Sequence, residues 1–146
     1  MAVKYGQLVE FTKKMEKLNE KQKEDFLESC CKELAARLLQ KVIERTPVGV
    51  YEHKKGGTLR RGWTAARNGA QGSDDIYIRK NGDSYIVDIT NAVEYAIYVE
   101  YGHRTRDHKK WVPGKYMLTV SEKELQTMAP QILERKIKKF LEDAIQ

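Results

Sequence analysis

Cysteine, histidine and long apolar runs are all scarce in this sequence of 146 residues. Its two cysteines, Cys30 and Cys31, are adjacent, and a helix would turn their side chains about 100° apart, which disfavours a strain-free disulfide between them. We interpret them as reduced thiols of a core or interface, because no second pair supports a redox or zinc motif. No apolar run reaches the roughly 18 residues of a membrane span, and residues 1–6 lack the pattern of a signal peptide. We therefore expect a protein that stays in the cytoplasm in which it is made, without a membrane partner.

The sequence also lacks a recognisable set of catalytic or metal-ligating residues. Of its three histidines, His103 and His108 lie near Glu100 and Asp107, whereas His53 belongs to a separate segment. A metal site needs three or four converging ligands, so we interpret these histidines as polar loop residues. No spacing brings two carboxylates together, no serine has the glycine context of a nucleophile elbow, and the phosphate-loop pattern is absent. We expect no catalytic residue, no metal and no cofactor, and therefore no enzyme.

What the sequence has is the composition of a globular protein. Its residues are 40% hydrophobic and 33% charged, unlike those of a disordered chain. A length of 146 residues is enough for one domain with a moderate core. The formal net charge of +6 is compatible with contact to nucleic acid or to an acidic protein, and it does not choose between them.

Apolar residues recur at the helical period at both ends of the chain. A short first helix is followed by Asn19 and Gln22, which resemble a capping box and predict a second, long helix. This helix should end at Thr46, because Pro47 disfavours helical backbone in the residue before it. A third stripe predicts a C-terminal helix that Pro130 should kink or split. The three stripes are Leu8, Phe11, Met15 and Leu18; Phe26, Leu27, Cys30, Cys31, Leu34, Leu38, Val42 and Ile43; and Leu125, Met128, Ile132, Ile137, Leu141 and Ile145.

Between these helices the apolar period changes to two. Two β-rich runs, residues 76–79 and 84–90, flank residues 80–83, and the Asn81-Gly82 pair between such runs is a strong hairpin signal. We expect both residues of that pair to adopt positive φ angles. Residues 63–67 are a candidate third strand.

The rest of the central region is less regular. Thr58 is placed to cap one helical turn, residues 95–101 favour a short helix that ends at Gly102 although their composition also suits a strand, and residues 103–114 are interpreted as a polar basic loop. This order of elements predicts a single α+β domain, in which a small antiparallel sheet with a central hairpin packs against a long N-terminal helix and a kinked C-terminal helix. Its parts are the helical residues 1–46, the loops and sheet of residues 47–114, and the helical residues 115–146.

Basic residues gather beside tryptophan in two places. The clusters are His53, Lys54, Lys55, Arg60, Arg61 and Arg67 beside Trp63, and His103, Arg104, Arg106, His108, Lys109 and Lys110 beside Trp111. Such a combination can track a nucleic-acid backbone and stack on its bases, but arginine and tryptophan are also enriched at subunit interfaces. Neither cluster belongs to a recognisable nucleic-acid module. A surface that docks onto another protein is therefore favoured, and non-specific nucleic-acid binding is the alternative.

An ordered set of motifs in the same region resembles a known family. The motifs are Thr46-Pro47-Val48, Gly57-Thr58-Leu59-Arg60-Arg61-Gly62-Trp63, Asn91 followed by Tyr95-Ala96-Ile97-Tyr98-Val99-Glu100-Tyr101-Gly102-His103, and Val112-Pro113-Gly114-Lys115-Tyr116-Met117-Leu118. In this order they resemble the minor structural proteins at the head–tail junction of tailed bacteriophages, called phage tail component, neck or tail-completion proteins, which also occur in prophages and phage-tail-like particles. The resemblance covers about residues 30–145. One departure is that residues 49–56 lengthen a loop that is short in many members.

The resemblance implies a non-enzymatic structural protein of a virion or phage-tail-like particle. It implies a ring of identical copies around the DNA channel, which contacts other neck, connector or tail-tube proteins and lies near DNA without reading its sequence. The assembly interface predicted on this reading consists of Tyr51, Arg60, Arg61, Trp63, Glu100, His103, Arg104, Arg106 and Trp111. The predicted contact with DNA in the channel consists of Lys54, Lys55, Lys109 and Lys110.

Overall fold

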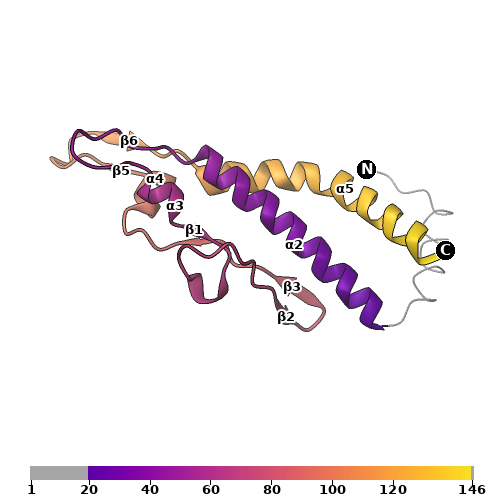
Figure 1. Ribbon diagram of the computed structural model, residues 1–146. Helices are drawn as coiled ribbons and strands as arrows, with labels where there is room; N and C mark the ends of the chain where they lie inside the picture. Colours follow the sequence, from indigo (N-terminus) through magenta and orange to yellow (C-terminus); the bar gives the residue numbers. More distant parts are fainter. Residues whose placement is uncertain (1–19, 146) are drawn as a thin grey trace.

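Two long helices form the body of the protein. The computed structural model describes residues 20–145, and within them α2 (Glu20–Arg45) and α5 (Met117–Ile145) lie side by side (Figure 1). They are the long N-terminal helix and the C-terminal helix that the sequence predicted. The helix expected over residues 8–18, and the cap expected from the side chain of Asn19, lie outside the described residues.

Helix α2 follows directly from its sequence. Its 26 residues contain neither glycine nor proline. Its buried residues form two pairs at helical spacing, Phe26 with Cys30 and Ala35 with Val42, and the two pairs lie on different sides of the helix. The helix ends just before Thr46 and Pro47, because the residue that precedes a proline is pushed out of the helical region. The predicted end is therefore confirmed.

Contacts along the full length of α2 show that α5 packs against it in the antiparallel direction. Near the start of α2, the rings of Phe26 and Phe140 stack with their centroids 4.2 Å apart. Further along, Nζ of Lys136 lies 3.1 Å from the carboxylate of Glu33. At the end of α2, Lys41 and Arg45 both pair with Glu124 of α5: Lys41 Nζ lies 3.3 Å from one carboxylate oxygen, and Arg45 contacts the other oxygen.

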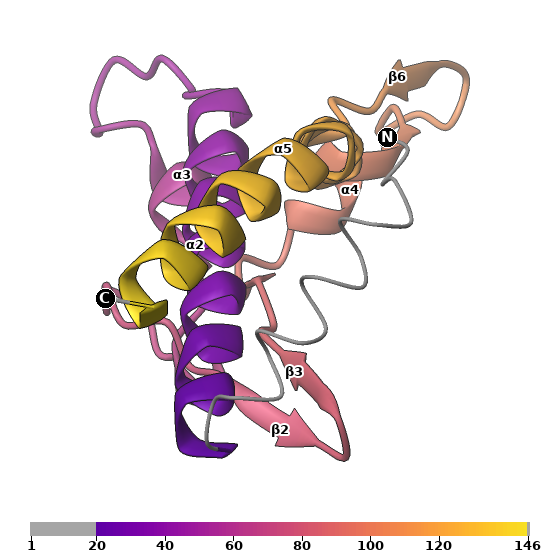
Figure 2. The same ribbon diagram turned by 90° about the vertical axis from the view of Figure 1, so that its right-hand side faces the viewer.

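Helix α5 continues through Pro130 as one element rather than splitting. Its orange first part and yellow last part run in different directions in Figures 1 and 2, as expected where a proline removes a hydrogen bond of the helix. Of the predicted apolar stripe, Leu141 is buried, whereas Met128 is 38% exposed. None of the helices within residues 20–145 is long and apolar enough to cross a membrane.

The strands form three separate two-stranded ladders instead of the single small sheet that we expected. All three are antiparallel: β1 (Trp63–Thr64) pairs with β4 (Thr90–Asn91), β2 (Arg79–Asn81) with β3 (Ser84–Ile86), and β5 (Gly102–Arg104) with β6 (Trp111–Pro113). The expected third strand therefore exists as β1, but its partner is β4 and not the hairpin. The fold is α+β, as predicted.

The hairpin of β2 and β3 is confirmed, and its turn is shifted by one residue from the expected position. Asn81 pairs with Ser84 as the last residue of β2, so the two turn residues are Gly82 and Asp83. Gly82 has a φ of 61°, whereas Asn81 is not among the residues with positive φ. Glycine in the first position of a two-residue turn is typical of type II′, which needs positive φ at that position alone.

Two short helices lie between the ladders. Helix α3 (Thr58–Arg61) is the expected helical turn, but Thr58 does not cap it: the capping position belongs to Gly57, with φ of 93°, and no side chain caps the helix. Helix α4 (Ala96–Tyr101) ends at Gly102, as predicted, and Gly102 has a φ of 89°. A 3₁₀ turn, η1 (Arg67–Gly69), follows β1.

The main hydrophobic core lies where the end of α2 and the beginning of α5 meet the two short helices. Val42, Leu59 and Met117, from α2, α3 and α5, are at most 5% exposed and form its centre. The surrounding half-buried residues are Leu38, Trp63, Val93, Ala96, Val99 and Leu118. This core fixes the segments that project from the same end of the molecule (Figure 2).

Candidate assembly surface

Residues 102–113 form a β-hairpin that we call the arm, which corrects the expectation of a polar loop. The arm consists of β5, β6 and a tip of residues 105–110. At the tip, the backbone N–H of Thr105 donates to the carbonyl of Lys110 at 2.8 Å. The Asp107 carboxylate accepts from the Thr105 hydroxyl at 2.6 Å and from the Lys109 N–H at 3.1 Å. These donors, the Thr105 hydroxyl first, hold the pKa of Asp107 below its usual value. The tip thus has a defined conformation within one subunit.

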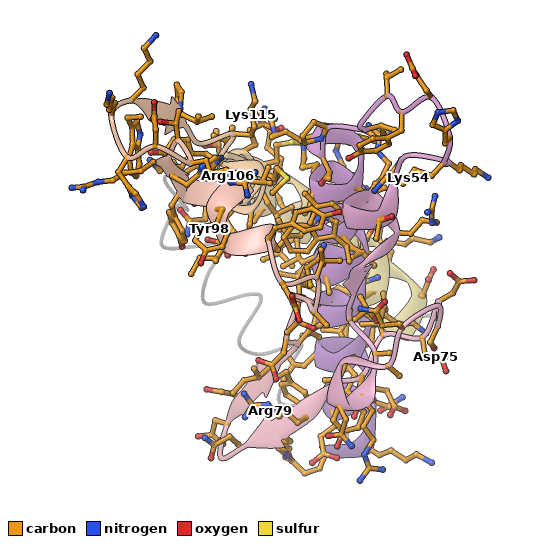
Figure 3. The ribbon with its side chains drawn as sticks, turned by 90° about the vertical axis from the view of Figure 1, so that its left-hand side faces the viewer. Lys54, Asp75, Arg79, Tyr98, Arg106 and Lys115 are labelled. Atoms are coloured by element: carbon orange, nitrogen blue, oxygen red, sulfur yellow. The ribbon has the colours of Figure 1, made fainter. Side chains whose placement is uncertain are left out.

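The arm carries uncompensated positive charge. Arg104, Arg106, Lys109 and Lys110 are all exposed, and none of the ion pairs among residues 20–145 involves them. The one carboxylate of the arm, Asp107, is engaged by the hydrogen bonds of the tip. Figure 3 shows Arg106 on this projection, away from the helical body.

Large apolar side chains are exposed beside the arm, and we call this set the aromatic face. It consists of Tyr95, Ile97, Tyr98, Tyr101, Trp111, Val112 and Tyr116, which are between 38% and 60% exposed. Some of these rings order one another: Tyr101 and Tyr116 meet edge to face with centroids 6.4 Å apart, and Tyr98 meets the ring of His103 at 6.2 Å. The aromatic face therefore combines α4 with the residue before it, β6, and the residue before α5.

Glu100, which was predicted at the assembly interface, is instead buried within the subunit. The residue is 6% exposed. Its carboxylate accepts the backbone N–H groups of Leu118 at 3.0 Å and Thr119 at 2.9 Å, and also the Thr119 hydroxyl at 2.9 Å. These amides belong to the first turn of α5, where N–H groups have no partner within the helix. Glu100 therefore caps α5 with a negative charge, which the helix dipole favours.

A close backbone contact brings α4 to the start of α5. The N–H of Lys115 donates to the carbonyl of Val99 at 2.7 Å, and that of Tyr116 donates to the carbonyl of Glu100 at 3.0 Å. A Cβ on Gly114 would lie 2.3 Å from the Glu100 carbonyl oxygen, so only glycine permits this approach. The base of the arm is thereby joined rigidly to the core.

Residues 47–57 form a second projection, which we call the extended loop. Tyr51 is 51% exposed, and Nζ of Lys54 lies 4.3 Å from the centre of its ring. A groove of about 240 Å³ separates the loop from Tyr95 and Val99 of the α4 region. Figures 2 and 3 show the extended loop and the arm as separate projections at one end of the molecule, and Figure 3 labels Lys54 and Arg106 on them.

Arg60 and Trp63 stabilise the end of α2 within the subunit. Thr46, which is fully buried, donates its hydroxyl to the Val42 carbonyl at 2.6 Å and accepts Nε1–H of Trp63 at 2.7 Å. The guanidinium of Arg60 donates to the Thr46 carbonyl at 3.1 and 2.7 Å. These bonds satisfy carbonyls that a helix leaves free at its C-terminus. Arg61 is exposed and bonds the Gly56 carbonyl at 3.0 Å.

The structure therefore places the predicted interface residues in different parts of the subunit. Arg104, Arg106 and Trp111 are exposed on the arm together with His103, which is half-buried and bonds the Arg104 carbonyl at 2.8 Å. The predicted DNA contacts, Lys54, Lys55, Lys109 and Lys110, are exposed but divided between the extended loop and the arm. Of the aromatic face, only Trp111 was among the individual residues predicted for the interface. A signal was present: four large apolar residues within the six positions of α4 are more than so short a helix can bury.

The cysteines are unpaired, as predicted, with Cys30 buried and Cys31 half-buried. Burial raises the pKa of both thiols, which lowers their reactivity. Within residues 20–145 no three histidine, cysteine or acidic side chains are grouped so that they could hold a metal ion.

The fold and this surface define a class of protein. Exposed aromatic groups beside unpaired cations are the features by which a protein docks onto other macromolecules. The sequence then gives the family. A family model described as "Bacteriophage HK97-gp10, putative tail-component" matches residues 9–102, and the chain belongs to this family. The protein accordingly has a structural role in a phage particle, and the match reaches the base of the arm. Neither the curated proteins nor the solved structures contained a significant match.

Proposed function

We propose that the protein is a neck or tail-completion subunit. In this proposal, copies of the chain assemble into a ring around the DNA channel at the head–tail junction, where they contact connector or tail-tube proteins. The protein acts without catalysis. The proposal refines the structural role in a phage tail that the family gives.

The observation that carries the proposal is the aromatic face. Each Å² of apolar surface removed from water contributes about 25 cal/mol, and these seven side chains are left 38–60% exposed in the isolated chain. Exposed apolar side chains that lie together beside charged ones mark a surface that another protein covers. The ring contacts of Tyr101 with Tyr116 and of Tyr98 with His103 bring part of this set together. Arg104 and Arg106 lie beside this face and outside the hydrophobic core. Substituting them therefore tests docking without disturbing the core.

The test is complementation of a phage or prophage that lacks this chain. We expect Arg104→Glu with Arg106→Glu to leave the circular dichroism and melting temperature unchanged but to yield separate heads and tails in electron micrographs. Lys138→Glu with Lys139→Glu is the matched control, because both lysines are exposed on α5 and the change in charge is equal. Joined particles at normal yield from the arm variant would contradict the docking role.

Non-specific DNA binding is a second candidate, and the four exposed lysines of the two projections favour it. If phosphate contact is the function, log affinity for duplex DNA falls linearly with log salt, with a slope of about −0.9 for each phosphate neutralised. Substituting Lys54, Lys55, Lys109 and Lys110 by glutamine should then flatten that slope. A flat slope in the unmodified protein would exclude this function while leaving the structural one intact.

The proposal also predicts that the purified protein hydrolyses neither DNA, RNA, nucleotides nor peptidoglycan, with or without divalent metal. Turnover that disappears in a His103→Ala variant would overturn the non-catalytic reading.

A further inference from the structure

We infer that in the assembled particle the arm of one copy docks into an acidic groove of the next copy. The inference rests on the proposed function and deepens it, because it names the surface that receives the arm. The occupant of the groove is a second copy of this chain.

The groove lies between the first half of α2 and the segment that leads into β2. It has a volume of about 460 Å³ and is lined by Asp25, Glu28, Ser29, Lys32, Ile76 and Ile78. The two isoleucines are half-buried, and the two carboxylates are exposed. The groove therefore offers two apolar side chains on the side of β2 and negative charge on its α2 side.

The charges of the groove complement those of the arm. Asp25, Glu28 and the neighbouring Asp74 and Asp75 are exposed, and none of them takes part in an ion pair among the described residues. Glu24, by contrast, is already paired with Lys80 at 3.2 Å. Among the described residues that line the groove, Lys32 is the one cation.

The arm carries four cations that form no ion pair with another residue in the described part of the chain, and its only carboxylate is engaged at the tip. On docking, two carboxylates of the lining, with Asp74 and Asp75 beside it, would meet the four basic groups of the arm. Lys32 in the lining and Asp107 in the arm each reduce this complementarity by one charge. Complementary potentials of this kind set the register of an interface and suppress wrong partners.

The arm also carries an anchor for the isoleucines of the groove. Trp111 is 60% exposed, and a tryptophan that fills a pocket is the kind of side chain that dominates binding energy. The hydrogen bonds of Thr105 and Asp107 already order the tip in the free subunit, so less conformational freedom is lost on docking.

The positions of the arm and the groove mean that their contact requires a second copy of the chain. The arm projects from one end of the molecule, whereas the first turns of α2, with β2 and β3, lie at the other (Figure 1). Asp75 lies well away from Arg106 in Figure 3. An arm cannot reach the groove of its own subunit, so each contact links different surfaces of two copies. Repetition of such a contact produces a ring when the rotation closes.

Photocrosslinking in complemented particles tests the contact directly. Trp111 is replaced by the photoreactive amino acid p-benzoylphenylalanine, particles are irradiated, and crosslinked peptides are identified by mass spectrometry. We expect crosslinks to residues 25–32 or 74–78 of a second copy. Crosslinks to DNA, to another particle protein or to a different segment of this chain would overturn the inference.

Charge exchange provides an independent test. Arg104→Glu with Arg106→Glu, and separately Asp25→Arg with Glu28→Arg, should each lower the yield of joined particles about tenfold or more, because like charges then face each other. Combining the four substitutions should restore most of that yield. If the groove variant alone joins particles normally, or the combination rescues nothing, the contact is wrong. Should Asp25→Arg with Glu28→Arg alter the circular dichroism, Asp74→Lys with Asp75→Lys takes its place.

The two proposals fail in distinguishable ways. A chain that is absent from particles, or particles that join normally without it, would refute the proposed function. Particles that need the chain and contain it, but give crosslinks outside the groove, would refute only this contact.

Discussion

Replacement of Glu100 by alanine should destabilise the isolated subunit, because this buried carboxylate caps α5. The substitution removes the acceptor for the backbone N–H groups of Leu118 and Thr119 and for the Thr119 hydroxyl. It leaves every side chain of the arm in place. The effect should therefore appear in folding before it appears in assembly.

The magnitude follows from two contributions. Loss of a helix N-cap costs about 1 kcal/mol, and leaving a buried N–H group without its partner costs about 1–3 kcal/mol. Water that enters the space can bond some of the freed N–H groups, so the loss is smaller than the sum of the costs of all three hydrogen bonds. We expect a decrease of about 3 kcal/mol in the free energy of unfolding. Such a loss corresponds to a fall of roughly 10 °C in melting temperature.

Glu100→Gln should have a smaller effect of about 1–2 kcal/mol, because the amide keeps one acceptor oxygen but turns an N–H₂ group towards backbone donors. Urea unfolding followed by circular dichroism at pH 7 measures both variants. Glu94→Ala is the control, since Glu94 is exposed just before α4 and its change should stay within about 0.5 kcal/mol. If Glu100→Ala unfolds at the same urea concentration as the control, the capping role is refuted.

Three further predictions concern the turn, the helix pair and the thiols. Gly82→Val should destabilise the protein by about 1 kcal/mol or more, because a β-branched residue is strained at positive φ. Asn81→Val in β2 should have little effect. Equal melting temperatures for the two variants would refute the assignment of Gly82 to the turn. Arg45 first, and then Lys41, lower the pKa of Glu124. The ion pairs of Glu124 therefore stabilise the fold above the usual carboxylate pKa of about 4.3 and are lost as the pH falls below that value. The melting temperature of Glu124→Gln should fall less steeply with acid than that of the unmodified protein, and identical slopes would contradict this. A thiol reagent should modify Cys31 faster than Cys30 in the native protein, so that Cys31→Ser leaves only a slow phase; two equally fast phases would contradict burial of Cys30.

Local patterns in the sequence determined several elements reliably. Helix α2 was predicted with its end, because a run without glycine or proline and a threonine–proline stop act through neighbouring residues alone. The same holds for the hairpin of β2 and β3 and for the end of α4 at Gly102. Even there, the choice between Asn81-Gly82 and Gly82-Asp83 as the turn depended on which strand residues paired.

Pairings between distant segments could not be read in this way. The side chains of β1 gave no indication that its partner would be β4 rather than the hairpin. Residues 103–114 look like a loop because they are polar and basic, yet both strands of the arm are held by backbone hydrogen bonds that do not depend on side-chain polarity. A short polar strand carries little sequence signal of its own.

Composition, apolar period and motif order are local properties of the chain, and they were enough to predict an α+β protein with two long helices, unpaired cysteines and the ordered motifs of a phage tail component. The roles of the charged and aromatic residues, by contrast, became visible only once the chain was folded. Folding turned Glu100 inward to cap α5, used Arg60 and Trp63 to close the end of α2, and left the arm and the aromatic face exposed. A carboxylate or an indole has the same identity in either role, and its surroundings are set by contacts with segments far away in the chain.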